Sequence, residues 1–399
     1  MTHQLLWHRA ALAIQLFFIL SSFAAAQQPP AAEPPMFGEE LDVRVVNVEA
    51  VVTDKDGNRV SGLKPEDFRL RVDGKEVPVE YFTEVKEGRL VAPATAEGGP
   101  ATAEPGAASE GAMPTWYLVF VDDYFPVAAH RNAVLKSLKD DLGRLGPNDR
   151  MAVVAWNGGR LSLVSNWSGS RKDLERAFDE AMARPARGFD RLKEFHNFQN
   201  DEAFASTATD DGRVLDLAVL STGLNERESA YADALVRQVQ AAVGATVSAM
   251  RGFAAPEGRK VLLLLAGGWP FSPQSFVRAN IPPSRSLADG DQLYRRLTNT
   301  ANLLGYTIYP VDVPGIQREA ASATAEAPAD LASFNMREQE VEGTLDFIAE
   351  ETGGRSLVNS NRAIALERAN SDTRSYYLLG FSPDWKRNDK SHAMKVEVR

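Results

Sequence analysis

The chain of 399 residues has no cysteine and little histidine. Without cysteine it forms no disulfide, no thiolate metal site and no lipid-modified cysteine anchor. Beyond residue 26 the histidines are His130, His196 and His392, which lie far apart and outside H-x-x-x-H spacing. This spacing argues against a zinc site or a histidine-based nucleophilic site, and no P-loop or G-x-G-x-x-G sequence is present to hold phosphate.

Long apolar runs are lacking as well. The apolar segment Ala10–Phe23 is shorter than the roughly 20 residues that a bilayer-spanning helix needs. It follows Arg9 and precedes Ala24-Ala25-Ala26, which is the pattern of a cleaved secretory signal peptide rather than an uncleaved anchor. We therefore expect residues 1–26 to be a signal peptide, residues 27–39 to be a disordered, proline-rich leader, and the mature protein to be secreted or periplasmic with no membrane span.

An excess of positive charge is also missing. Asp and Glu number 54 against 44 Lys and Arg, so the formal net charge is −10. This acidic balance argues against nucleic acid as a partner, because nucleic-acid binding needs clustered cations.

Residues 40–90 show the pattern of a small β module. Apolar residues alternate with polar ones from Val46 to Val52 and from Phe68 to Val72, and Asp73-Gly74 predicts a hairpin turn. Residues 91–114 are mostly Ala, Gly, Pro, Glu and Thr, so we expect a flexible linker there.

Residues 115–371 change to an alternation of strands and helices. Two apolar runs, 117–121 and 261–265, have no polar alternation, which is typical of strands buried on both faces of a parallel sheet. The pattern predicts an α/β domain with a parallel-rich sheet. Within it, residues 184–230 have weak periodicity and are interpreted as an insertion, and residues 316–338 as a surface loop.

Residues 372–399 return to a β pattern that suits a C-terminal hairpin. A two-stranded hairpin is not stable alone. We therefore expect it to pack on residues 40–90 in one small Ig-like β-sandwich, with the α/β domain inserted within it.

Several segments together resemble a known family. Val52–Gly57 and Val60–Phe68 look like the N-terminal signature of von Willebrand factor A-related proteins of the acidobacterial type. Ile348–Arg355 and Tyr377–Phe381 look like its C-terminal signature, and Arg259–Leu264 fits its central strand. The resemblance covers nearly all of the chain after the leader and is weakest over the insertion. It implies a von Willebrand A fold, which is Rossmann-like, with a parallel-rich sheet flanked by helices.

That fold often holds a divalent ion with D-x-S-x-S after the first strand, a loop threonine and an aspartate after the fourth strand. The resemblance points to Asp122, with Asp123 as a substitute ligand. Mg²⁺ needs an octahedron of hard oxygens, but the motif here reads Asp122-Asp123-Tyr124-Phe125-Pro126 and Gly267 stands near the later aspartate position. The residues favour solvated or helix-capping carboxylates, and hence a degenerate metal-ion-dependent adhesion site, over a remodelled Mg²⁺ site. No other cofactor is expected. The loop threonine has no clear match in this sequence. Thr207 and Thr209 are candidates by position alone.

Aromatic residues follow both central strands, at Tyr124-Phe125 and at Trp269 and Phe271. Carboxyl ends of parallel strands meet at one edge of a sheet, so the two groups should lie together. One interpretation makes Tyr124, Phe125, Trp269 and Phe271 an apolar partner-binding surface. The other has the insertion packing over them as a small core, since monomers rarely expose large apolar patches.

The sequence therefore leads us to expect an exported, non-enzymatic binding protein that takes a protein or cell-surface partner at this edge. One alternative is a structural scaffold of the cell envelope in which the β-sandwich binds and the α/β domain is inert. A lower alternative is a hydrolase with its site in residues 184–230.

Overall fold

The computed structural model describes residues 45–55, 59–91, 114–207, 217–254, 258–273, 277, 290–313, 331–383 and 392–399. The expected signal peptide and leader, and nearly all of the expected linker, lie outside these ranges. Within them, no helix is both long and apolar enough to cross a bilayer.

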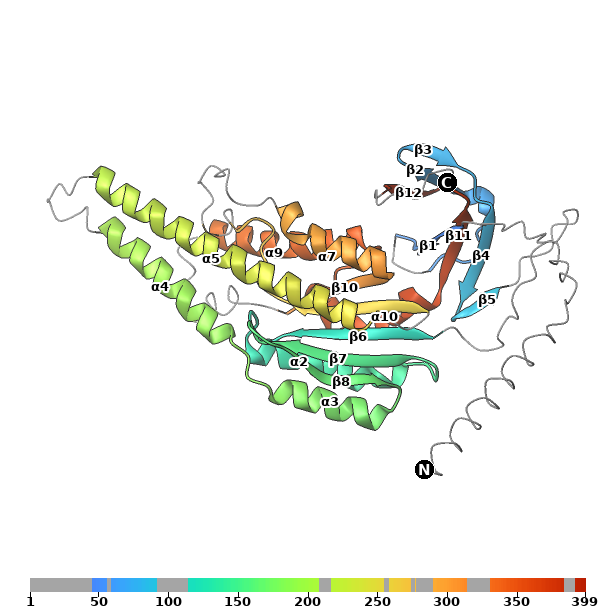
Figure 1. The fold of residues 1–399 in the computed structure, drawn as a ribbon, viewed down its shortest axis with the longest axis horizontal. Helices are drawn as coiled ribbons and strands as arrows, with labels where there is room; N and C mark the ends of the chain where they lie inside the picture. The colour runs from blue at the N-terminus through green and yellow to red at the C-terminus, as the bar shows by residue number, and fades with distance from the viewer. Residues whose placement is uncertain are drawn as a thin grey trace, which may run out of the picture. The chain divides into compact units, whose positions relative to one another are not determined.

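A five-stranded sheet forms the centre of the α/β part, in the order β10-β9-β6-β7-β8 (Figure 1). Its strands are β6 (Thr115–Asp122), β7 (Arg150–Trp156), β8 (Leu161–Ser168), β9 (Arg259–Ala266) and β10 (Tyr306–Asp312). All pairs are parallel except β7 with β8, so the predicted parallel-rich sheet is confirmed. Strand β6 lies between β7 and β9, which places a switch in strand order beside its carboxyl end.

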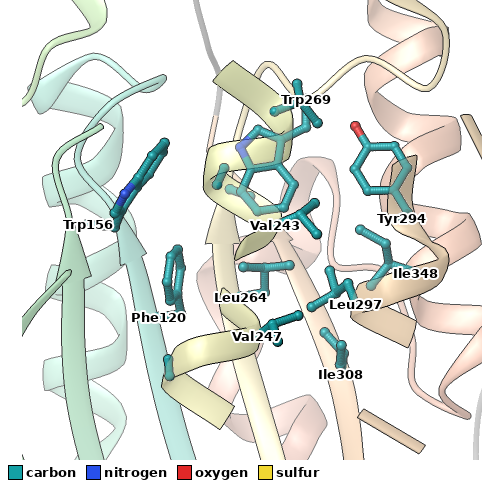
Figure 2. Close-up of a cluster of buried hydrophobic side chains, with 14 of the residues drawn as sticks. Phe120, Trp156, Val243, Val247, Leu264, Trp269, Tyr294, Leu297, Ile308 and Ile348 are labelled. Atoms are coloured by element: carbon teal, nitrogen blue, oxygen red, sulfur yellow. The ribbon is translucent and has the colours of Figure 1, made fainter. Parts of the chain in front are cut away.

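Helices cover both faces of this sheet because every central strand is apolar on both sides. Tyr117, Val119 and Val121 of β6 face one layer, and Leu118 and Phe120 face the other. The first layer contains α2 (Ala128–Asp140), α3 (Arg171–Ala183) and α10 (Ala365–Arg374), with short 3-10 turns η3 (Asp141–Arg144) and η4 (Asn359–Ile364). The second contains α5 (Leu217–Gly252), α7 (Gly290–Leu304) and α9 (Leu331–Glu351). Figure 2 shows the core of the second layer, where Leu264 and Ile308 of the sheet meet Val243 and Leu297.

The expected insertion 184–230 is helical over most of its described residues, which are 184–207 and 217–230. Helix α4 (Gly188–Thr207) runs beside the first part of α5, and the Phe198 and Tyr231 rings stack with their centroids 4.8 Å apart (Figure 1). The periodicity of α4 is weak because only part of the helix is covered: Phe195 packs in the core, where the Arg337 guanidinium of α9 lies 5.0 Å from its ring centroid, whereas Phe189 is 61% exposed. Helix α9 likewise begins at Leu331, inside the expected surface loop.

The two chain ends build two further sheets. One has the order β1-β11-β4-β5 and the other β12-β2-β3. Their strands are β1 (Val46–Ala50), β2 (Phe68–Val72), β3 (Lys75–Val77), β4 (Tyr81–Lys86), β5 (Arg89–Val91), β11 (Tyr376–Phe381) and β12 (Met394–Val398), and the 3-10 turn η2 (Pro65–Asp67) precedes β2. The expected C-terminal hairpin is wrong, because β11 and β12 enter different sheets. Each pairs with N-terminal strands, whose apolar faces give it more to bury against than its neighbour would.

A shared apolar core joins these sheets. Phe68 of β2 packs against Tyr377 and Leu379 of β11, and the rings of Phe68 and Tyr377 lie 5.1 Å apart. The Tyr377 hydroxyl donates to Val60 O (3.0 Å) and accepts from Leu63 N (3.1 Å). The expected packing of residues 40–90 against the C-terminal segment is therefore present.

Candidate functional site

The loops after β6 and β9 meet at the carboxyl edge of the sheet. Val121 pairs with Leu265, so the chain leaves both strands at the same level. The Trp269 indole Nε1 donates to Asp122 Oδ2 at 2.9 Å. Trp269 in turn stacks on Tyr294 of α7 with a centroid distance of 6.4 Å (Figure 2). The expected meeting of the two loops is therefore present, and a hydrogen bond joins them.

Among the residues that the structure describes, the hydrogen bonds to Asp122 all come from nitrogen donors. Its Oδ1 accepts from the backbone N–H groups of Tyr124 (2.7 Å) and Phe125 (3.2 Å), an Asx turn that starts the loop. Its Oδ2 accepts from Trp269. The side chain is fully buried, and this burial raises the pKa of Asp122 to about 7, against the opposing effect of the three hydrogen bonds.

Asp123 lies between two arginines. Its Oδ1 is 2.6 Å from Arg131 Nη1 of α2, and its Oδ2 is 2.7 Å from Arg184 Nε, just after α3. Burial raises the pKa of Asp123, and the two guanidinium groups oppose that shift. The carboxylate thus ties the β6 loop to two helices of one layer.

Arg131 is a fully buried cation surrounded by oxygens. Besides Asp123, its guanidinium donates to Asn132 Oδ1 (2.9 Å), Met182 O (3.2 Å) and Arg184 O (2.8 Å). The last two carbonyls belong to the C-terminal end of α3, where the helix dipole favours a positive charge. All of these contacts compensate the desolvation of the guanidinium.

The donor set here does not fit a divalent metal ion. Mg²⁺ needs several hard oxygens free to face it, whereas Asp122 accepts from three N–H groups and Asp123 faces two guanidinium groups. Within the described ranges no three His, Cys, Asp or Glu side chains converge as a metal site would require. Thr207 ends α4, and Thr209 lies outside the described residues. The carboxylates of Asp122 and Asp123 thus resemble neither metal ligands nor solvated surface groups. They are buried and have a structural role.

The four aromatic residues predicted to bind a partner do not form an open surface. Tyr124, Phe125 and Trp269 are buried, and Phe271 is half-buried against Tyr294 and Phe347. An apolar recognition surface made of these rings is therefore a wrong expectation for this structure. The reason is that the free energy of an aromatic ring is lower when it is buried in the core than when it is exposed to water.

The start of α4 supplies part of this cover, as the second interpretation expected. Arg187 N donates to Asp123 O (2.8 Å), and Phe195 joins the buried cluster that contains Tyr124 and Trp269. The Arg191 guanidinium carbon lies 4.5 Å from the centroid of the Tyr124 ring, a cation–π contact. The insertion therefore folds its first turns over the edge of the sheet.

Tyr124 is held from several directions. Its ring centroid lies 5.3 Å from that of Trp156 and 5.1 Å from that of Phe125. Gly158, with φ of +97°, leaves the space that the ring occupies, because a Cβ there would collide with it. Tyr124 is thus a rigid ring at the end of β6.

Beside Tyr124 a groove of about 360 Å³ opens between the strand loops and α5. It is lined by Tyr124, Trp156, Gly158, Ala234, Arg237, Gln238 and Ala241. Sequence reasoning missed the four α5 residues, although their i, i+3, i+4, i+7 spacing marks one helix face. Exposed arginine and glutamine on a helix look like an ordinary solvated face until the tertiary structure places a strand end opposite them.

A second hollow of about 300 Å³ lies between α2 and η4, with His130, Ser137, Asn359 and Arg362 among its lining residues. Arg362 Nη1 is 3.5 Å from Asp312 Oδ2 at the end of β10. His392 instead contacts Asp73 at 2.7 Å, near β2. These two histidines are thus in different parts of the fold, and the side chain of His196 lies outside the described set.

No protein-family profile matches the chain, and no curated protein matches it in sequence. Among solved structures, the chain is similar to the crystal structure of the TFIIH p34 N-terminal domain, with 12% identity and a TM-score of 0.27. The match covers 64% of this chain and 95% of that chain. At that TM-score the likeness carries no argument for fold or function.

Proposed function

We propose that this is an exported, non-enzymatic binding protein, secreted or periplasmic, related to the von Willebrand factor A proteins. In this proposal a von Willebrand A-like domain with a degenerate metal site captures a protein or cell-surface partner, next to an Ig-like β-sandwich. Two features support the family. The strand order puts the first strand of the sheet at its centre, and the two signature segments contact each other through Tyr377.

The observation that carries the binding role is the groove at the carboxyl ends of β6 and β7. Open α/β sheets bind ligands beyond the carboxyl ends of their strands, near a switch in strand order. The groove lies beside such a switch, and its volume is at the lower end of the range for ligand pockets, about 300–1,000 Å³. Of the four rings expected to contact a partner, Tyr124 lines this groove, and Phe125, Trp269 and Phe271 do not.

The contacts of Asp122 and Asp123 make this edge independent of metal in our proposal. Arg131 already supplies a fixed positive charge to Asp123, so the loop needs no bound cation to keep its shape. Partner capture should then be insensitive to a chelator.

Capture from envelope extract by the full chain tests the proposal. Ala241→Trp would fill the groove from the exposed side of α5 and should reduce capture about tenfold or more. Gln240→Trp is the matched control, because residue 240 is exposed on the same helix but does not line the groove. Capture that persists unchanged in Ala241→Trp, or that disappears with a chelator, would contradict the proposed site.

A second candidate, the envelope scaffold, has its own support in exposed apolar side chains on the terminal sheets. Leu90 is 52%, Met394 48% and Tyr81 47% exposed. If these sheets do the binding, Leu90→Glu should abolish capture while Ala241→Trp leaves it intact. The opposite result favours the groove.

A further inference from the structure

The groove beside Tyr124 combines an apolar floor with a polar wall. Tyr124 and Trp156 supply the floor from the sheet, and Ala234 and Ala241 keep the α5 side open because their side chains are small. Arg237 and Gln238 project from the same helix face between the two alanines. Both rings are nearly buried, so an occupant meets only their small exposed edges and, next to them, a cation and an amide.

The floor is preorganised. Three features hold Tyr124 in one position. The Arg191 guanidinium lies against its ring, Gly158 has no Cβ that would displace the ring, and Phe125 makes an edge contact with it. Rigid aromatic surfaces lose little conformational entropy on binding, which favours affinity. The groove needs no rearrangement to accept a ligand.

Arg237 is the distinctive charge of this groove. Three other arginines of this edge are paired: Arg184 with Asp123, Arg187 with Asp190 and Arg191 with Glu194. Arg160, in the loop after β7, does not line the groove. Arg237 is exposed, and in the described part of the chain no carboxylate pairs with it, including Asp233 one turn earlier. In a chain with net charge −10, an unpaired arginine beside aromatic rings offers a local site for an anion.

We propose that the groove binds an acidic peptide segment of a protein partner, with an Asp or Glu carboxylate on Arg237 and an adjoining apolar side chain against the exposed edges of Tyr124 and Trp156. The guanidinium accommodates a carboxylate through two parallel N–H···O bonds, and Gln238 adds an amide donor. The inference rests on the proposed binding role of the groove and specifies the chemistry of its occupant.

Selection from a random short-peptide library displayed on phage, against the full chain, tests the inference. Enriched peptides should carry an Asp or Glu next to an apolar residue. A selected peptide and its Glu→Gln or Asp→Asn twin are then titrated by fluorescence anisotropy. Arg237→Gln should weaken the acidic peptide about tenfold or more, and the amide twin should bind the unmodified chain as weakly. Arg237→Lys should retain part of the affinity.

Arg251→Gln is the matched control, since Arg251 is exposed on the last turn of the same helix and does not line the groove. It should leave affinity unchanged. The selection could instead yield peptides without acidic residues whose affinity for the Ala241→Trp variant is reduced. That result would overturn the inference while leaving the groove as a binding site. Peptides indifferent to both Arg237→Gln and Ala241→Trp would overturn the inference and the proposed groove together. Selection of peptides from this chain's own sequence would instead identify self-association and overturn the assignment to a separate partner.

Discussion

At the residue scale, the carboxyl edge is organised by two neighbouring carboxylates with different partners. Asp122 faces three N–H donors, and Asp123 faces two guanidinium groups. Both are buried, and their environments differ in charge: neutral donors leave the desolvation of Asp122 largely uncompensated, whereas cations compensate that of Asp123. Separate consequences follow for each side chain.

Asp122 should make stability depend on pH. Its pKa is raised from the usual 3.8 to about 7 in the folded chain, so the folded state binds this proton more tightly than the unfolded state. The stabilisation is complete below the unfolded pKa and is lost as pH rises through about 7. Relative to Asp122→Asn, the free energy of unfolding should therefore increase by up to about 4 kcal/mol between about pH 8 and pH 4. Denaturant titrations across that range measure it.

Trp269→Phe serves as the companion variant. It removes one hydrogen-bond donor that favours ionised Asp122. The pH range over which the stabilisation by protonated Asp122 is lost should therefore move to higher pH. A pH profile that is the same for the unmodified chain and Asp122→Asn would contradict the assignment.

Arg131 should be essential for stability. Arg131→Met leaves Asp123 with a single cation and removes one hydrogen-bond donor from each of the Met182 and Arg184 carbonyls, which should reduce the free energy of unfolding by about 3–5 kcal/mol. Lys136→Met on the same helix removes an exposed pair with Asp140 and should change it by less than about 1 kcal/mol. Chemical denaturation of both variants gives the comparison, and equal small effects would show that the buried pair contributes little.

Metal addition should not stabilise the unmodified chain. Because its carboxylates already have nitrogen partners, Mg²⁺, Mn²⁺ or Ca²⁺ should leave the melting temperature unchanged and give no calorimetric binding signal at this edge. Micromolar binding that Asp122→Ala abolishes would restore the metal-site interpretation.

At the element scale, the end of α9 shows why adjacent glycines are not equivalent. Gly353 has φ of +70° and open space around it, which is the usual way for a helix to end. Gly354 instead passes directly against the carbonyl of Ile308 in β10, and its N–H donates to Ala349 O at 2.8 Å. The first glycine allows the turn, and the second allows the helix end to reach the sheet.

Alanine at these two positions should therefore have different effects. Gly353→Ala meets only backbone strain, which costs about 1 kcal/mol. Gly354→Ala places a Cβ against the backbone of β10 and should destabilise the chain by roughly 3 kcal/mol or more, because neither strand nor helix end can move freely. Thermal unfolding ranks the two, and a reversed order would be evidence against this packing.

At the scale of the whole molecule, the chain closes on itself. Strand β11 pairs with β1 on one side and β4 on the other, and β12 pairs with β2. Arg259, which opens β9, is 2.7 Å from Glu49 of β1 and lies over the Tyr376 ring at 4.5 Å. Both terminal sheets thus combine strands from residues 46–91 with a strand from residues 376–398, and the α/β part lies between these segments in sequence.

Tyr377 tests this closure. Tyr377→Phe keeps the ring but removes both hydroxyl hydrogen bonds, to Val60 O and from Leu63 N, and should reduce stability by about 1–3 kcal/mol. Amide hydrogen exchange should increase first in residues 60–68, far from position 377 in sequence. Tyr81→Phe, at an exposed ring, should leave exchange unchanged. An effect confined to β11 would contradict the role of Tyr377 in joining the two ends.

Local patterns of residues were enough to predict several of the elements. Unbroken apolar runs predicted the buried parallel strands, because a strand covered on both faces has no polar side. Alternation of apolar and polar residues predicted β1 and β2. The same patterns placed the loops after β6 and β9 at one edge.

The contacts within those loops and the pairing of the terminal strands depend on the tertiary structure. An aspartate looks the same in the sequence whether its carboxylate faces water, a metal ion or Arg131. Which of these groups it contacts depends on how the elements pack. The expected hairpin failed for the same reason: strand pairing depends on which apolar faces lie opposite, and these came from residues about 300 positions apart. The groove, too, exists only because α5 crosses the ends of β6 and β7.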